Sequence, residues 1–511
     1  MMLSRETSFP SSIHRSKGLR SLFIGNTRGS WLGAALPNVM KQLTCIRSLN
    51  VSGSSIKEIP KEVGKLIHLR HLNFKGCRKL VSLSETMCDL CNLQSLNVFQ
   101  CSSLKELPQA IVKLVNLRHL RTCYSSVAFM PKGIGRLTCL RTLDCFTLCG
   151  DGENESKAAN LRELKNLDHI GGSLVIENIR GGGIEDAAKA QLKNKKHLLC
   201  LKLNFDLYHK DGILIEILQP SLDLERLSIN LYGGIVLPNW MMALTRLQDL
   251  ELIDCGNLEV LPPLGRLPTL EFLQLYSVAV RRLGAGFVGI AVENAKINEG
   301  EIARVTAFPK LRRLVISFLF KLEEWDGIER RVGEEDATTT SIFIMPQLQK
   351  LSLIDCTLLR ALPDYVLAAP LQVLHVVECP NLSKRYGKEE KGAVPGTSSS
   401  TQNGGPVILE LRLDKVRRPL MRTRANDQNK VKELMDSIKE IGLQVPLNAN
   451  INEGDIAFLK LKSLQIWGLK EVEEWDGIER RLGEEDATTT SIFIMPQLQH
   501  LRIHERPLLR I

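Results

Sequence analysis

Residues 413–424 carry a dense group of cations. This segment, LDKVRRPLMRTR, has one lysine and four arginines among twelve residues. Guanidinium groups bind phosphates and carboxylates through paired hydrogen bonds, so phosphate binding is the first chemistry to consider. No aromatic residues alternate with these cations, as they do where proteins stack on nucleic-acid bases. The segment therefore indicates a phosphate or acidic ligand, and we expect no nucleic-acid partner.

The thirteen cysteines are the other residues that could do chemistry, as nucleophiles, disulfides or metal ligands. Cys88 and Cys91 have the C-x-x-C spacing of a zinc site, but no second Cys or His pair answers them at zinc-finger spacing. Several others lie at the end of a short apolar triplet or just past it: Cys101, Cys145, Cys255, Cys356 and Cys379. We expect small, reduced core residues, with no metal and no cofactor.

The apolar triplets themselves recur every 23 or 24 residues in the first part of the chain. Their central residues are Leu49, Leu72, Leu96, Leu120 and Leu143. Three residues before each lies another aliphatic residue: Ile46, Leu69, Leu93, Leu117 and Leu140. The pattern resumes less regularly at Leu201, Leu227, Leu250, Leu273, Leu314, Leu351, Leu374, Leu464 and Leu501. This is the L-x-x-L-x-L pattern and the period of a leucine-rich repeat.

Each repeat predicts a short strand whose leucines point inward and whose other residues point outward. A proline in the second half, as in IKEIPKEVGKL, ends the strand and forces a turn. One repeat cannot bury its apolar face alone, so successive repeats must stack. We predict an α/β fold, a leucine-rich-repeat solenoid with a curved parallel sheet on the concave side and irregular turns and short helices on the convex side. Between the regular repeats and Leu201 we expect a strand at 171–179 and a short helix within 185–198.

The outward positions of the first five strands are the candidate protein-binding residues on the concave face. They are Arg47, Asn50, Arg70, His71, Asn73, Gln94, Asn97, Arg118, His119, Arg121, Arg141 and Asp144. Four arginines recur at one position of the repeat and predict a column of positive charge. Such a column suits an acidic protein surface.

Several strings resemble a known family when read in order. They include GGSLVIENI, LYGGIVLPNWM, LPPLGRLPTLEFLQL, FPKLRRLVISFLFKLEEWDG and MPQLQKLSLIDC. They are similar to the leucine-rich-repeat region of plant CC-NB-ARC-LRR disease resistance proteins, over about 20–385 and again over 451–511. The resemblance implies recognition of a pathogen effector or a host protein. The chain has no G-x-x-x-x-G-K-[ST] phosphate loop, so we expect a repeat domain without its nucleotide-binding module, working with a separate NB-ARC-containing receptor.

The sequence from 386 to 499 contains a linker, a foreign block and a duplication. Residues 386–405 are rich in Gly, Ser and Thr, as in flexible linkers. A strand-like segment and a helix with an apolar stripe follow within 406–446, a small strand–helix insertion near the C-terminus. The segment 323–349 returns at 473–499 with 26 of 27 positions identical. The block between the two copies therefore reads as an insertion.

The block 406–446 resembles the N-terminal half of plant sulfiredoxin, which uses ATP to reduce over-oxidised peroxiredoxins. The resemblance implies that Arg418, Lys430 and Ser437 correspond to residues that contact ATP phosphates, here as a vestigial site. The family's catalytic cysteine lies in a later G-C-H-R loop, and no cysteine follows Cys379 in this chain. A thiolate is indispensable for reducing a sulfinic acid, so we expect no such activity. The block then remains a decoy, an assembly scar, or a phosphate-binding segment.

Together these patterns predict a non-enzymatic protein that recognises another protein in plant defence. The alternative is a sulfiredoxin-type cysteine sulfinic acid reductase. We expect six segments: a lead-in at 1–40, regular repeats at 41–150, irregular repeats at 151–385, a linker at 386–405, the sulfiredoxin-like block at 406–446, and duplicated repeats at 447–511. No run of 18 apolar residues occurs, so we expect no membrane contact. We expect a cytoplasmic location, with the nucleus as a second compartment, and no chloroplast transit peptide in the Ser- and Arg-rich N-terminus.

Overall fold

The computed structural model describes most of the chain up to residue 386 and two short segments beyond it. The described residues are 2–3, 19–24, 31–150, 152, 154–180, 184–206, 212–290, 304–326, 341–386, 463–467 and 500–504. They belong to two compact units, unit 1 (Met1–Val280) and unit 2 (Arg281–Ile511). The linker and the strand and helix expected within 406–446 lie outside the described residues. None of the described helices is long and apolar enough to cross a bilayer.

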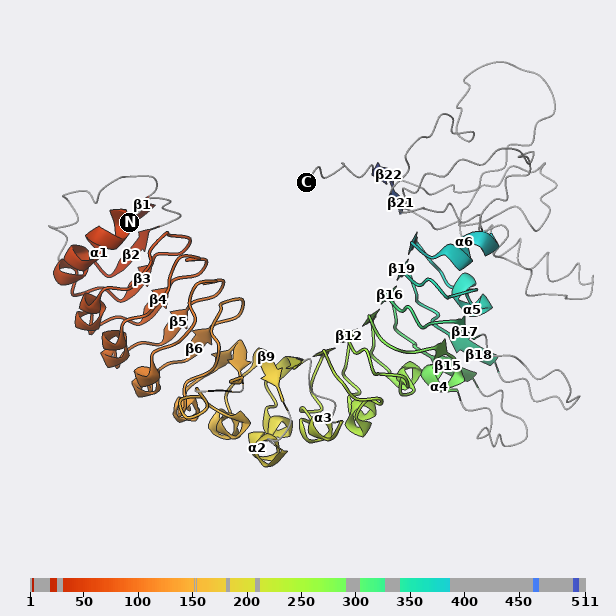
Figure 1. Ribbon diagram of the computed structural model, residues 1–511, viewed down its shortest axis with the longest axis horizontal. Helices are drawn as coiled ribbons and strands as arrows, with labels where there is room; N and C mark the ends of the chain where they lie inside the picture. Colours follow the sequence, from red (N-terminus) through yellow and green to blue (C-terminus); the bar gives the residue numbers. More distant parts are fainter. Residues whose placement is uncertain are drawn as a thin grey trace, which may run out of the picture. The chain divides into compact units, whose positions relative to one another are not determined.

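Unit 1 is built on parallel strands that pair in the order of the sequence (Figure 1). The first group is β1 (Met2–Leu3), β2 (Ser21–Ile24), β3 (Ser48–Asn50), β4 (His71–Asn73), β5 (Ser95–Asn97), β6 (His119–Arg121) and β7 (Thr142–Leu143). The second group is β8 (Cys145–Thr147), β9 (Gly172–Ile179), β10 (Leu198–Phe205), β11 (Arg226–Asn230), β12 (Asp249–Ile253) and β13 (Phe272–Tyr276). The expected strand at 171–179 is therefore confirmed as β9.

The register of the strands follows the leucines that define the repeat. Leu49 pairs with Leu72, and the same position continues through Leu96 and Leu120 to Leu143. All five are buried, as are the aliphatic residues three positions earlier. Strand β2 joins β3 in this register, so the parallel sheet already begins within the segment 1–40 that we had set apart as a lead-in.

Short helices and 3-10 turns connect the strands of unit 1 and lie on the opposite side from them (Figure 1). They are α1 (Trp31–Gln42), η2 (Lys61–Lys65), η3 (Glu85–Asp89), η4 (Gln109–Lys113), η5 (Ile134–Arg136), η6 (Leu161–Asn166), α2 (Ile184–Ala190), η7 (Leu192–Asn194), α3 (Ile213–Ile217), η8 (Asn239–Ala243) and η9 (Leu264–Arg266). Proline precedes several of these turns, as Pro60 precedes η2 and Pro108 precedes η4. A proline has no N–H to donate to a sheet, so it ends pairing at that point.

Buried thiols occupy a fixed position in the repeats, five residues after the central leucine. In unit 1, Cys77 donates from Sγ to the Val51 carbonyl oxygen at 3.2 Å, and Cys101 donates to that of Phe74 at 3.2 Å. Each bond joins one repeat to the one before it. Burial raises the pKa of Cys101 and of Cys255 to about 12. None of the thirteen cysteines, all within the described residues, forms a disulfide, and the five that we expected to be core residues are buried.

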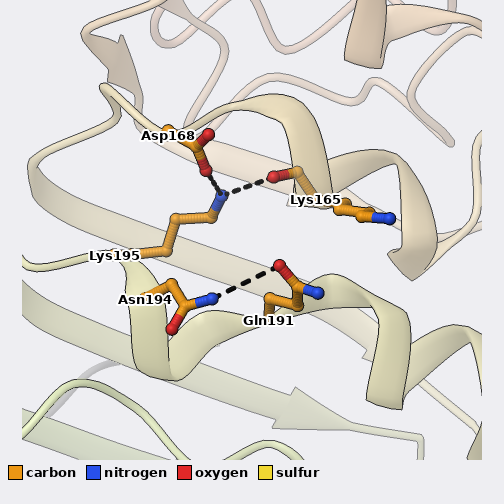
Figure 2. A network of polar contacts seen from close by, with 5 residues as sticks. All are labelled: Lys165, Asp168, Gln191, Asn194 and Lys195. Carbon is orange, nitrogen blue, oxygen red and sulfur yellow. Dashed lines mark hydrogen bonds and ion pairs between the residues drawn. The ribbon is translucent and has the colours of Figure 1, made fainter.

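One charged side chain lies at a position that is otherwise apolar, the residue that closes each 3-10 turn. The residue that closes each turn is a leucine in η2, η3, η4, η5, η6, η8 and η9, whereas η7 closes on Lys195. The Lys195 side chain is 0% exposed. Its Nζ donates to the Lys165 carbonyl oxygen at 3.2 Å and lies 3.2 Å from Oδ1 of Asp168 (Figure 2). Asn194 and Gln191 bond to each other beside this network at 3.3 Å.

Burial lowers the pKa of Lys195 below its usual value, and the Asp168 carboxylate opposes this effect. Asp168 is 70% exposed, so water screens its attraction for the buried ammonium. The network therefore satisfies the ammonium with hydrogen bonds but does not fully offset the loss of its hydration.

Unit 2 repeats the same plan with its own parallel pairs. Strands β16 (Arg313–Ser317), β19 (Lys350–Ile354) and β20 (Val373–Val377) pair in order and align Leu314, Leu351 and Leu374. The other pairs are β14 (Arg282–Leu283) with β17 (Glu324–Trp325), β15 (Arg304–Ala307) with β18 (Ser341–Ile344), and β21 (Ser463–Trp467) with β22 (His500–His504). The helices are α4 (Ala285–Val288), α5 (Asp364–Leu367) and α6 (Pro380–Tyr386). The strands expected around Leu464 and Leu501 are confirmed and pair with each other.

Candidate functional site

A ladder of backbone hydrogen bonds aligns the residues that enter β2 to β7. The amide of Arg47 donates to the Arg20 carbonyl, and that of Arg70 donates to the Arg47 carbonyl at 2.8 Å. The ladder continues through Gln94 and Arg118 to Arg141 in steps of 2.8 Å. We call Arg20, Arg47, Arg70, Arg118 and Arg141 the basic column. All five side chains are exposed.

The structure thus brings together the four arginines expected from the sequence and adds Arg20. The missed signal is the string LRSLFI at 19–24, which has the same apolar spacing as the later repeats. Neighbouring strands of a sheet lie about 4.8 Å apart, so cations on adjacent strands repel one another strongly. Gln94, in the middle of the column, separates Arg70 from Arg118 by two strand spacings and lessens this repulsion.

The arginines of the basic column have no internal acidic partners, unlike Arg180, Arg246 and Arg282 elsewhere in the described residues. Arg180 lies 2.6 Å from Asp206, and Arg246 lies 2.7 Å from Asp223. Among the residues that the structure describes, no arginine of the basic column forms an ion pair. Aligned cations without internal counter-charges are poised to attract an external anion.

The next position of each repeat carries small polar residues and two histidines. Ser48, His71, Ser95, His119 and Thr142 occupy it in order across β3 to β7. His119 hydrogen-bonds through Nδ1 to Oγ1 of Thr142 at 3.1 Å. Burial lowers the pKa of His119, and the nearby Arg121, Arg141, His71 and Arg118 lower it further. At neutral pH His119 therefore adds little to the positive charge of the arginines.

The predicted asparagines shape the turns that leave the strands. Oδ1 of Asn50 accepts a hydrogen bond from the amide of Ser52 at 2.9 Å. Asn73 and Asn97 do the same for the amides two residues later, at 2.9 and 3.0 Å. Such Asx turns fix the loop after a strand. The carbonyl end of each asparagine side chain is therefore already engaged.

Asp144 has a structural place at the junction between β7 and β8. Its Oδ1 accepts hydrogen bonds from the amides of Thr122, at 2.7 Å, and Cys123, at 3.3 Å. Its backbone oxygen accepts from the amide of Val175 in β9 at 2.9 Å. Burial raises the pKa of the Asp144 carboxyl, although these hydrogen bonds oppose that effect. We therefore leave Asp144 out of the binding surface, because its carboxylate holds neighbouring repeats together.

An aromatic cluster lies on the loops that leave β4, β5 and β6, and the sequence pattern did not reveal it. Phe99 and Tyr124 make an edge-to-face contact with ring centroids 5.3 Å apart. Nζ of Lys75 lies 5.4 Å from the centroid of Phe99, within the range of a cation–π contact. Tyr124 is 76% exposed. Exposed aromatic side chains of this kind are enriched in protein interfaces.

The basic column ends beside a small pocket. The pocket has a volume of about 200 Å³ and is lined by Arg118, Cys139, Arg141 and His169. Further along the same face of unit 1 the charge changes sign. The ladder position is then held by Glu225, Gln248 and Glu271, each donating its amide to the residue before it in the ladder. Within unit 1, positive charge on this position is thus confined to the strands up to β7.

The remaining candidates are the three residues of the sulfiredoxin-like block and the possible metal ligands. Arg418, Lys430 and Ser437 lie outside the described residues, so the vestigial ATP site stays a prediction. Within the described part of the chain, no three His, Cys, Asp or Glu side chains group as a metal site would require. Cys88 is buried, whereas Cys91 is exposed.

Comparison with known proteins agrees with the repeat geometry. Residues 59–354 match a family model described as a leucine-rich repeat region. The chain belongs to the leucine-rich repeat family. RGA1 of Solanum bulbocastanum is 32% identical to this leucine-rich repeat chain over 367 residues, which are 69% of the chain and 36% of RGA1. The disease resistance protein RGA2 of the same species is 31% identical over 335 residues, 63% of the chain and 32% of RGA2.

The leucine-rich repeat chain thus spans about a third of the length of these two relatives. Its repeat region is homologous to that of plant disease resistance proteins, as the sequence strings predicted. A sulfiredoxin of Arabidopsis thaliana, named as chloroplastic/mitochondrial, is 65% identical over 57 residues. These residues make up 11% of the chain and 46% of that sulfiredoxin. The second resemblance is confirmed, over a stretch longer than the 41 residues of the block 406–446.

Proposed function

We propose that this leucine-rich repeat chain recognises an acidic protein partner in plant defence, without catalysis, through the strand face of β2 to β7. The observation that carries the proposal is the basic column. Five exposed arginines share one position of the repeat and have no internal counter-ion among the described residues. Electrostatic complementarity of this kind speeds encounter and selects partners of opposite charge.

The exposed Tyr124 and its contact with Phe99 support the same face. Recognition surfaces combine charged positions with a few large aromatic anchors. The partner is a pathogen effector or a host protein, and a separate NB-ARC-containing receptor carries the signal in the cytoplasm. The homology with disease resistance proteins supports this setting.

Reversing the column should remove the partner and spare the fold. The test variant changes Arg47, Arg70, Arg118 and Arg141 to Glu, and the control variant changes Lys61, Lys65, Lys113 and Arg136 to Glu. The control residues are exposed on the 3-10 turns opposite the strands and give the same change in net charge. Pull-downs from leaf extract, quantified by mass spectrometry, should show at least one acidic protein reduced about tenfold with the test variant only, a loss of about 1.4 kcal/mol.

The captured protein is then purified and titrated against the three forms of the chain. Its affinity should fall with added salt for the wild type and for the control variant. If all three forms capture the same proteins in the same amounts, the basic column is not the recognition surface.

A second candidate function rests on the 65% identity with sulfiredoxin. Reduction of a sulfinic acid needs a thiolate, and no cysteine follows Cys379 in the sequence. We expect no reduction of sulfinylated peroxiredoxin when the purified chain is mixed with ATP and Mg²⁺, measured by mass spectrometry of the peroxiredoxin cysteine. Turnover above that of a heat-denatured sample would make the chain an enzyme.

A further inference from the structure

The pocket at the end of the basic column is formed by side chains from three successive repeats. Arg118 and Arg141 are the residues that enter β6 and β7, Cys139 lies two residues before Arg141, and His169 belongs to the loop that leads to β9. The volume of about 200 Å³ is below the range of about 300–1,000 Å³ that is usual for drug-sized ligands. It suits one side chain or a small ion.

The backbone explains why the column of side chains stops at this point. The next position of the ladder is Gly171, whose amide donates to the Arg141 carbonyl at 2.9 Å. A Cβ on Gly171 would lie 2.9 Å from both Cβ and the carbonyl oxygen of His197. Real Cβ atoms do not approach other atoms so closely, so a larger residue would require a backbone shift. The ladder position after Arg141 therefore remains free of a side chain.

The formal charges that line the pocket are those of its two arginines. Two guanidinium groups and an imidazole line it, and no carboxylate does. The acidic residue next to His169 in the sequence is Asp168, whose Oδ1 is engaged with the buried Lys195 at 3.2 Å. Paired guanidinium groups bind a carboxylate or phosphate through parallel hydrogen bonds.

We propose that this pocket is an oxyanion site that anchors one glutamate or aspartate carboxylate of the acidic partner between Arg118 and Arg141. The assignment rests on the proposed function, and it names the group that the partner must present. A carboxylate fits better than an isolated phosphate because the two pocket arginines are the last members of the basic column. An acidic segment can place further carboxylates along that column.

Cys139 makes the site testable before any partner is known. It lines the pocket and is exposed. Cys91, three residues before Gln94, is also exposed and acts as the internal reference, whereas Cys45 lies two residues before Arg47 and shares the repeat position of Cys139. Iodoacetate and iodoacetamide alkylate a thiolate in the same way, forming an S–C bond as iodide leaves, but only iodoacetate carries a carboxylate. The iodoacetate-to-iodoacetamide rate ratio at Cys139 should exceed that at Cys91 by about three- to tenfold, because Arg118 and Arg141 both attract the anionic reagent.

Matched variants decide whether the pocket arginines are responsible. In Arg118→Gln and Arg141→Gln the ratio at Cys139 should fall towards that at Cys91. Arg136→Gln, an exposed arginine of η5 on the opposite side, should leave it raised. Equal ratios at Cys139 and Cys91 in the wild type would overturn the site, whatever the fate of the proposed partner.

A second measurement identifies the anion. A twelve-residue peptide of alternating Glu and Ser should protect Cys139 from iodoacetamide, whereas the Gln and Ser version should not. Inorganic phosphate at the same ionic strength should protect it less than the Glu peptide does. Protection by phosphate alone would overturn the carboxylate assignment. A raised rate ratio with no acidic protein in the pull-downs would leave the pocket standing and reject the proposed function.

Discussion

Replacing Lys195 with leucine should raise the free energy of unfolding of the chain by about 1–4 kcal/mol at pH 7. Leucine closes the equivalent 3-10 turn in η2, η3, η4, η5, η6, η8 and η9, so the site is shaped for an apolar side chain. The substitution removes a fully buried ammonium whose only acidic partner in the network, Asp168, is largely exposed. It also leaves the Lys165 carbonyl oxygen without this hydrogen-bond donor, and this loss reduces the gain in the free energy of unfolding.

The pH dependence of stability gives a second readout for the same residue. The pKa of Lys195 is lowered in the folded chain, so the unfolded chain binds more protons at this residue. Stability of the wild type should therefore rise as the pH increases from the folded pKa towards about 10.4, the usual value for lysine. The Lys195→Leu variant should lack this rise.

Equilibrium urea unfolding at several pH values measures both effects. Lys196→Leu, an exposed neighbour, is the matched control and should change stability by no more than about 0.5 kcal/mol. Hydrogen exchange of the β9 and β10 amides would show whether the gain is local to these repeats. A Lys195→Leu variant that is less stable, with the alkaline rise intact, would contradict the view that the buried charge is a cost.

Replacing Asp144 with alanine should lower the free energy of unfolding by about 1–3 kcal/mol, because two partly buried amides lose their acceptor. These amides, of Thr122 and Cys123, belong to the preceding repeat. Asp144→Asn keeps an oxygen at the same place and should preserve both bonds. Hydrogen exchange of the two amides should accelerate in the alanine variant and not in the asparagine variant.

The charge of Asp144 predicts a further difference between these variants. Burial raises the pKa of this carboxyl in the folded chain, so the folded state holds its proton more tightly. Ionisation therefore costs stability at neutral pH, and the cost disappears as the pH falls through the folded pKa. Asp144→Asn should be as stable as the wild type, or more so, at pH 7 and equal to it in acid. Equal losses in both variants would show that the charge matters and the acceptor oxygen does not.

The repeat fold could be predicted because each repeat restates the same apolar spacing. The ladder from Leu49 to Leu143 follows from alternation of side chains in a strand, and stacking follows from the need to bury that face. The alignment of Arg47, Arg70, Arg118 and Arg141 follows from the same repeat spacing, because each lies two residues before a central leucine. Arg20 was missed because its central leucine, Leu22, lies 27 residues before Leu49 instead of 23 or 24, with α1 between them.

The features that escaped prediction depend on contacts between repeats. Alternation places Asp144 outward, but β7 ends at Leu143, and the carboxylate turns back to the amides of the preceding repeat. The repeat spacing marks position 195 as inward, three residues before Leu198, but a lysine between Lys193 and Lys196 gives no sign of which groups receive its buried ammonium. Its partners, Lys165 and Asp168, are 30 and 27 residues away. The pocket likewise needs side chains from three repeats and a glycine that no periodic pattern requires.

Chemical modification of the buried thiols can report which repeats of this chain separate from their neighbours. Cys77, Cys101 and Cys255 are buried, each bonded to a carbonyl of the preceding repeat, and burial raises the pKa of all three. A reagent in solution can reach such a sulfur only when its own repeat separates from the one before it. The order in which these cysteines become modified in the native chain is therefore the order in which its repeats come apart.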